Sequence, residues 1–222
     1  MNKPDTNSQY GPIGENGLQF FGKVSASISH EIKNVLAIIN ENAGLLEDLS
    51  IAAQRGAAID PERLNRACQQ FSKQIRRADV IIKNMNQFAH SVDQFAAPVD
   101  LYNTTELVSN LAGRLAAMRK VTLQVIPPLS PVVIDSNPFL LENLIWLVLE
   151  YALDSTSEAL TLTLAPEKND SGTRLRICGI DGLSEDFTSK LPVGCKDLLC
   201  ASNAYLAVDM TGKALIIHLT EI

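Results

Sequence analysis

A short run of polar residues near the N-terminus has the composition of a nucleophilic site. The run Ser29-His30-Glu31-Ile32-Lys33-Asn34 places an imidazole beside a carboxylate, and an amide follows one helical turn later. The neutral imidazole of His30 offers a nucleophilic ring nitrogen, and Glu31 could accept the other ring proton or orient the ring. The amide of Asn34 could position a water or a phosphoryl oxygen. The run therefore predicts a reactive histidine with two polar neighbours that could assist it.

The residues around this run predict the first of two long helices. Apolar residues recur three and four positions apart from Leu18 to about Leu49, and His30 lies off that stripe. Its neighbours one turn away are polar or small, so we expect the imidazole to be exposed on the flank of the helix. Residues 1–17 are polar and contain three glycines, which predicts a flexible arm.

A second helix is predicted from Pro61 to Val92, after a turn around Gly56 and with Asp60 as its N-cap. Its apolar residues alternate four and three positions apart, which is the repeat of a coiled-coil seam. This seam consists of Leu64, Cys68, Phe71, Ile75, Ala78, Ile82, Met85, Ala89 and Val92. A lone hairpin of two such helices cannot bury both apolar stripes well, whereas two copies forming a four-helix bundle can. We therefore expect a homodimer.

A second domain is predicted after Pro98, where the helical pattern ends. The expected elements are a helix from Thr104 or Thr105 through Arg119, strands over 121–126 and 132–134, a helix begun by Pro138 and ending at about Asp154, a hairpin of strands over 160–164 and 173–178, a short helix over 196–203 and a final strand over 214–219. This order predicts an α/β sandwich. The chain is thus expected to be α+β, with an arm over 1–17, a helical hairpin over 18–97 and the sandwich over 98–222.

Composition excludes several classes of function. Apolar residues make up 46% and charged residues 20%, as in globular proteins, and the net charge of −6 argues against a general nucleic-acid binder. No apolar run reaches the roughly 20 residues of a membrane helix, and the N-terminal residues lack the apolar stretch of a signal peptide. The four cysteines and three histidines show no metal-ligand spacing. We expect a cytoplasmic protein with no nucleic-acid or membrane partner and no cofactor of its own.

The segment SASISHEIKNVLAIINENAGLL resembles the phosphoacceptor helix of sensor histidine kinases that carry a His-Glu-Ile-Lys-Asn box. The run IRRADVIIKNMNQFAHS is similar to the second helix of that family, and PVDL to its lead-in to the ATP-binding domain. The resemblance covers roughly residues 20–180. It implies that His30 accepts a phosphoryl group and passes it to a receiver-domain aspartate, with Glu31 as the acid/base residue. The motif Glu31-x-x-Asn34 also matches the one with which such bundles dephosphorylate a receiver. Val35 stands where the family often has proline, so the usual kink is not expected.

The run RKVTLQVIPPLSPVVIDSNPFLLENLIWLVLEYALDST resembles the first half of the family's ATP-binding domain, but the nucleotide site that this implies is degenerate. Tyr151 replaces the magnesium-binding asparagine that should precede Ala152, and Leu147 replaces the earlier asparagine. The adenine-reading Asp-x-Gly-x-Gly segment is reduced to Asp181-Gly182, and the segment after it is too short for a lid that cradles phosphates. The chain therefore resembles the dimeric histidine phosphotransferases of phosphorelays, and ATP-dependent kinase activity is not expected.

The resemblance implies a histidine phosphotransferase of a two-component phosphorelay, which exchanges a phosphoryl group between His30 and a response-regulator receiver. The receiver would supply the Mg²⁺, and an upstream hybrid histidine kinase is a further candidate partner. Three alternatives stay open. They are a receiver phosphatase that uses Glu31 and Asn34, a non-catalytic dimeric scaffold of the pseudo-histidine-kinase type, and a kinase with an unusual nucleotide site.

Overall fold

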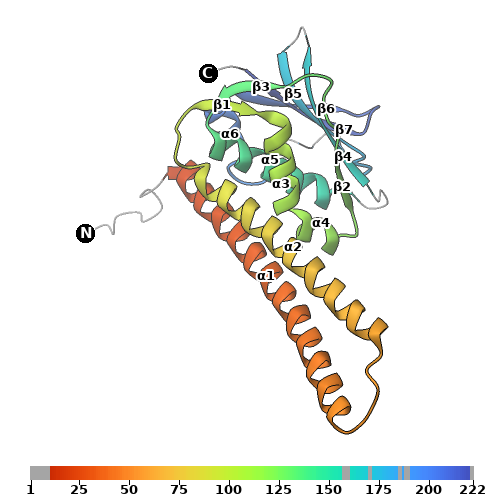
Figure 1. The fold of residues 1–222 in the computed structure, drawn as a ribbon. Coiled ribbons are helices and arrows are strands. Elements are labelled where there is room, and N and C mark those ends of the chain that lie inside the picture. Colours follow the sequence, from red (N-terminus) through yellow and green to blue (C-terminus); the bar gives the residue numbers. More distant parts are fainter. Residues whose placement is uncertain (1–10, 157–160, 170–171, 185–186, 188–190, 221–222) are drawn as a thin grey trace, which may run out of the picture. The chain divides into compact units, whose positions relative to one another are not determined.

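The computed structural model describes residues 11–156, 161–169, 172–184, 187 and 191–220 (Figure 1). These residues form two compact units. The hairpin unit consists of residues 25–87, and the sheet unit consists of the described residues before 25 and after 87. Among the helices of the described part, none is long and apolar enough to cross a membrane.

The two long helices predicted from the apolar repeat are α1, Gly11–Gln54, and α2, Pro61–His90. The predicted N-cap of α2 is confirmed, because the Asp60 carboxylate accepts a hydrogen bond of 2.9 Å from the Glu62 backbone N–H. The predicted arm is wrong for residues 11–17, which are helical, and residues 1–10 lie outside the described part. Packing explains the difference, since a Cβ at Gly17 would lie only 3.1 Å from the Phe139 ring.

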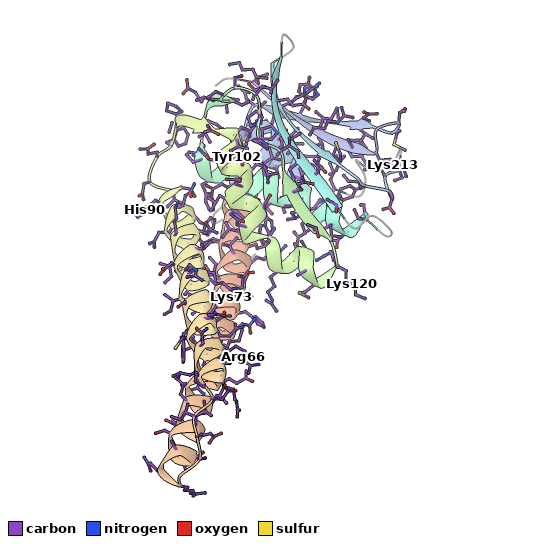
Figure 2. The ribbon with its side chains drawn as sticks, turned by 45° about the vertical axis from the view of Figure 1, so that its right-hand side comes forward. Arg66, Lys73, His90, Tyr102, Lys120 and Lys213 are labelled. Carbon is purple, nitrogen blue, oxygen red and sulfur yellow. The ribbon has the colours of Figure 1, made fainter. Side chains whose placement is uncertain are left out.

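The hairpin unit is held together by a stripe of residues that differs from the predicted seam. Ile28 and Val35 of α1 are buried, as are Ala67, Gln74 and Ile81 of α2, which follow one another at seven-residue intervals. The seam lies beside this stripe and is largely uncovered in a single chain. Its large apolar members Leu64, Ile75, Ile82 and Met85 are between 43% and 53% exposed. A single hairpin therefore buries one stripe of α2 and leaves the seam exposed to solvent. Arg66 and Lys73 on the same helix are also exposed (Figure 2).

The sheet unit contains a five-stranded sheet in the order β2-β4-β5-β7-β6. The strands are β2 (Thr122–Val125), β4 (Thr161–Asn169), β5 (Gly172–Cys178), β7 (Ala214–Leu219) and β6 (Ala204–Asp209). β2 and β4 are parallel, and every other neighbouring pair is antiparallel. A separate antiparallel pair is formed by β1 (Ala97–Asp100) and β3 (Val133–Ser136). The hairpin of strands, the strand near 121–126 and the final strand are confirmed, whereas β1 and β6 have no counterpart in the sequence prediction.

The helices of the sheet unit are α3 (Leu101–Leu111), α4 (Gly113–Met118), α5 (Pro138–Asp154) and α6 (Cys195–Ala201). The predicted start of α5 is confirmed, because Asn137 caps it with a 2.9 Å bond from the Leu140 N–H. The predicted Thr104 or Thr105 cap is wrong. Asp100 caps α3 instead, and both threonine hydroxyls donate to the backbone carbonyls four residues earlier.

The helices form a layer on one face of the sheet (Figure 1). α3 contacts β2 and β4, α6 contacts β6, and α5 contacts both α3 and α6. The outer side of α5 is covered by the start of α1, where Phe20 packs against the rings of Phe139 and Trp146, each with a centroid separation of 5.6 Å. Phe88 joins this cluster at 5.2 Å from Phe20. Such aromatic pairs contribute about 0.5–1.5 kcal/mol each beyond their burial.

This aromatic cluster explains which residues form the boundaries between the two compact units. The predicted domain boundary lies between residues 97 and 98, whereas the compact units divide after Val24 and before Phe88. The start of α1 and the last residues of α2 thus belong with the sheet rather than with the hairpin.

Candidate histidine phosphotransfer site

His30 lies on α1 within the hairpin unit, and its side chain is exposed, as the sequence predicts. Asn34 follows one turn later and is also exposed. Its Nδ2 lies 3.1 Å from His30 Nδ1, which is within hydrogen-bond distance. α1 continues without interruption through Val35, whose side chain is buried within the hairpin unit.

The contact with Asn34 bears directly on which nitrogen of His30 carries the ring proton and which has a free lone pair. When Asn34 Nδ2–H donates to Nδ1, the ring proton of the neutral imidazole is on Nε2, and Nε2 has no free lone pair. When the amide turns over, its Oδ1 accepts from Nδ1–H, and Nε2 carries the free lone pair. Rotation of this amide, together with transfer of the ring proton from Nε2 to Nδ1 through solvent, therefore exchanges a ring that donates at Nε2 for a ring whose Nε2 lone pair is free.

Glu31 points towards the second helix of the hairpin. Its Oε2 lies 3.8 Å from the guanidinium of Arg77 on α2, and its side chain is 22% exposed. A half-exposed ion pair of this length contributes at most about 1 kcal/mol to stability. The structure thus brings His30 and Asn34 together and pairs Glu31 with Arg77.

Arg77 is the residue near this site that sequence reasoning misses. It belongs to the run that resembles the second family helix, but nothing in that run marks it as the partner of a particular carboxylate. The available signal is the hairpin geometry, because Glu31 and Arg77 lie at similar distances from the turn at Gly56 and so face each other across antiparallel helices.

The positions that should bind magnesium and nucleotide are in the sheet unit, and the side chains there do not fit such a ligand. Leu147 and Tyr151 are buried in the helical layer, at 8% and 7% exposure. Glu150 is already paired, because Lys23 Nζ donates to both of its carboxylate oxygens at 2.8 Å. Lys23 belongs to the start of α1, which covers this face of α5.

The remnant of the adenine segment, Asp181-Gly182, forms a turn at the end of α5. The Gly182 N–H donates to the Ser155 carbonyl at 2.9 Å, and a Cβ at Gly182 would overlap that carbonyl. Close approach of the backbone thus explains the glycine, which agrees with a structural role for this turn.

Three further titratable groups belong to the packing of the sheet unit. Burial raises the pKa of Glu142 to about 8, partly opposed by a hydrogen bond with Ser91. Burial also raises the pKa of the Cys195 thiol to about 11, so this cysteine is a poor nucleophile. Burial and the nearby Arg174 lower the pKa of His218, whose ring stacks on that of Tyr205 with a centroid separation of 4.4 Å.

His90, at the end of α2, is exposed and contacts Asp93 at 2.7 Å (Figure 2).

No protein-family profile matches the chain, and no curated protein matches it. Several solved structures are similar. A bacterial phosphotransferase aligns over 90% of this chain and 95% of its own length, with 16% identity and a TM-score of 0.46. The Acinetobacter baumannii histidine kinase AdeS aligns over 86% and 97%, with 13% identity and a TM-score of 0.46. The ATP-binding domain of PrrB from Mycobacterium tuberculosis aligns over 58% and 99%, with 16% identity and a TM-score of 0.47. All three likenesses are distant.

Proposed function

We propose that this chain is a histidine phosphotransferase of a two-component phosphorelay. The observation that carries the proposal is the exposed pair of His30 and Asn34, 3.1 Å apart on one face of α1. The pair stands in a run that resembles a phosphoacceptor box, on a helix whose opposite side is buried in a hairpin. An exposed nucleophile on a rigid helix suits a reaction whose other reactants arrive on a second protein.

In the proposed reaction, a receiver domain docks on the flank of α1 with its phosphoaspartate in line with His30 Nε2. The bond between phosphorus and the aspartate oxygen breaks as the bond between phosphorus and Nε2 forms. The proton on Nδ1 stays in place, held by Asn34 Oδ1 in the turned-over amide. Mg²⁺ supplied by the receiver neutralises charge on the phosphoryl oxygens. The same steps in reverse return the group to a receiver, so the chain could connect two of them.

We also propose that the chain does not carry out ATP-dependent autophosphorylation. Leu147 and Tyr151 stand where the family resemblance requires amide ligands, and the adjacent Glu150 is neutralised by Lys23. We therefore propose that the sheet unit has lost nucleotide binding and serves the docking of the partner.

We further propose that the active form is a homodimer. In a single chain the seam along α2 leaves large apolar side chains about half exposed, including Ile75 at 53% and Ile82 at 46%. A second hairpin would bury them in a four-helix bundle, which is the arrangement that the seven-residue repeat favours.

The direct test is incubation with a panel of radiolabelled phospho-receivers in the absence of ATP. We expect label on the wild type that is labile in acid and stable in base, and no label on His30→Ala. His90→Ala is the matched control, because His90 is also an exposed histidine, at the end of α2, and this variant should accept label normally. Absence of label on the wild type, with receivers that bind it, would exclude the relay.

A receiver phosphatase is the second candidate, and the exposed amide of Asn34 favours it. That amide could orient a water at the receiver's phosphoaspartate without any phosphohistidine. In this case Asn34→Ala abolishes phosphate release while His30→Ala keeps it. A non-catalytic scaffold predicts instead that receivers bind both variants and lose phosphate at their own rate.

A further inference from the structure

A groove of about 410 Å³ lies beside β2, at one edge of the five-stranded sheet. Its described lining comes from α3, α4 and β2, which lie next to one another in Figure 1. The volume is within the range of about 300–1,000 Å³ that is typical of ligand sites. The groove belongs to the sheet unit, whereas His30 belongs to the hairpin unit. It is thus built from other residues than the candidate phosphotransfer site.

β2 presents unpaired backbone groups along this groove. Among the strands of the described part, β2 pairs with β4 alone. Val125 is opposite Leu164, and the Leu164 carbonyl accepts a hydrogen bond of 2.8 Å from the Ile126 N–H. In a parallel pair this pattern directs the backbone groups of every second residue away from the neighbouring strand. The N–H and C=O groups of Leu123 and Val125 therefore point to the open edge, where the described residues offer them no backbone partner.

The groove also has room for the side chains of an added strand. On the helix side it is lined by Gly113, Ala116 and Ala117, whose small size leaves the space open. On the strand side it is lined by Leu123 and Val125, which are only half-buried although they lie beside two fully buried leucines of β4. An added strand with apolar residues at alternate positions would cover these two side chains.

The remaining residues define the polarity of a matching segment. Thr122 and Gln124 alternate with the apolar pair and are exposed, so the other face of an added strand would lie beside polar side chains. Glu106 is exposed and is the one charged residue in the described lining. Its Oε1 accepts a hydrogen bond of 2.6 Å from the Tyr102 hydroxyl, and no cation of the described part forms a salt bridge with it. Charge complementarity thus favours a basic residue in the segment and disfavours an acidic one.

We propose that β2 and this groove bind an extended segment of a partner protein, which adds a further strand to the sheet. The segment alternates apolar and polar residues and carries a lysine or arginine that meets Glu106. The backbone groups of Leu123 and Val125 form its main-chain hydrogen bonds, and the groove receives its apolar side chains. This inference does not depend on the proposed phosphotransfer, because it uses no residue of the hairpin unit.

The probe is the peptide acetyl-Lys-Val-Thr-Val-Thr-Val-amide, carrying a fluorophore and titrated with the full chain. We expect saturable binding by fluorescence anisotropy. Two further peptides carry N-methyl groups, one on its valines and the other on its threonines. An added strand faces β2 with one edge only, so one of these two should bind about tenfold more weakly or worse, and the other should bind like the parent.

Hydrogen exchange locates the bound peptide. Exchange of the Leu123 and Val125 amides should slow on binding, whereas that of Gln124, whose N–H faces β4, should stay the same. A peptide with glutamate in place of lysine should bind more weakly, because it would bring a second carboxylate to Glu106.

Gly113→Leu fills the groove without a clash, because a Cβ there would have no atom within 4 Å. Leucine is also the better helix former, so this variant should fold, and it should weaken peptide binding by about tenfold or more. Gly22→Leu is the matched control, because Gly22 is an equally open helical glycine that does not line the groove, and it should bind like the wild type.

The proposal is overturned if the parent peptide shows no saturable binding, or if both N-methylated peptides bind like the parent. Equal binding by Gly113→Leu and Gly22→Leu, or no loss with the glutamate peptide, would equally contradict it. Exchange at Leu123 and Val125 that slows with rising protein concentration, without any peptide, would identify a second copy of the chain as the occupant and would also overturn it.

Discussion

Asn34 Nδ2 lies 3.1 Å from His30 Nδ1, one turn further along the exposed face of α1. This contact joins the His30 ring to a side chain that can either donate or accept a hydrogen bond, and the choice decides the position of the ring proton. The pair therefore links the two activities proposed for this site. A free Nε2 lone pair would serve the proposed phosphotransfer, whereas an amide directed at water would serve the alternative, dephosphorylation.

The first prediction concerns Asn34→Asp. A carboxylate can only accept, so it should hold the proton on Nδ1 and leave Nε2 free. We expect phosphotransfer to persist while any water-directing activity of the amide falls. ¹⁵N chemical shifts of the His30 ring should show the neutral form shifting towards the Nδ1–H tautomer. Asn40→Asp, an exposed asparagine on the same helix, serves as the control. An unchanged tautomer ratio in Asn34→Asp would contradict the role assigned to the amide.

The second prediction concerns the ion pair of Arg77 with Glu31, whose closest atoms are 3.8 Å apart. Arg77→Met should change the free energy of unfolding by less than about 1 kcal/mol, because the pair is partly exposed. If Glu31 acts as the acid/base residue, its loss in Glu31→Gln should slow phosphotransfer more than loss of its partner does. Denaturant unfolding and single-turnover transfer measure the two effects. A slower transfer by Arg77→Met than by Glu31→Gln would assign the main role to the arginine.

The third prediction concerns the seam of α2. Ile82→Glu places a charge in the apolar stripe that a second copy is proposed to cover, so it should shift the chain towards monomer in sedimentation experiments. Val80→Glu is the matched control, because Val80 is 54% exposed but lies outside the seam. Equal dissociation by both variants, or a wild type that is monomeric at all concentrations, would remove the proposed bundle.

The fourth prediction concerns the pH dependence of stability. Burial raises the pKa of Glu142 from 4.5 to about 8. Between these values the unfolded chain releases the proton and the folded chain keeps it, so stability falls as pH rises, by up to about 1.4 kcal/mol per pH unit, and levels off above pH 8.

Glu142→Gln keeps the shape and cannot ionise. It should remove most of this slope and stabilise the protein most at pH 8, as measured by urea unfolding at several pH values. Glu47→Gln, at an exposed position on α1, controls for the change in net charge. Parallel stability curves for Glu142→Gln and the wild type would show that the carboxyl is not protonated in the folded state.

Sequence reasoning succeeded where local chemistry decides the structure. Asp60-Pro61 and Asn137-Pro138 predict two helix starts, because a capping side chain followed by proline is sufficient in itself. The proximity of His30 and Asn34 follows from the four-residue spacing alone.

Sequence reasoning failed where partners that are distant in the sequence decide the local structure. β1 and β6 are short strands whose pairing with β3 and β7 no local pattern indicates. The glycines of residues 11–17 disfavour a helix, yet packing of this segment on α5 overcomes that preference.

The sheet unit is discontinuous in the sequence, and the hairpin with His30 is in effect inserted into it. A contiguous fragment such as residues 98–222 would lack Phe20 and Phe88, and would leave Phe139 and Trp146 without their ring partners. We therefore expect that one proteolytic cut does not separate α1 from the sheet unit, because Phe20 packs against rings of that unit. A protease that nicks the turn near Gly56 should produce two pieces that stay associated, because the first holds Phe20 and the second holds the rings against which it packs.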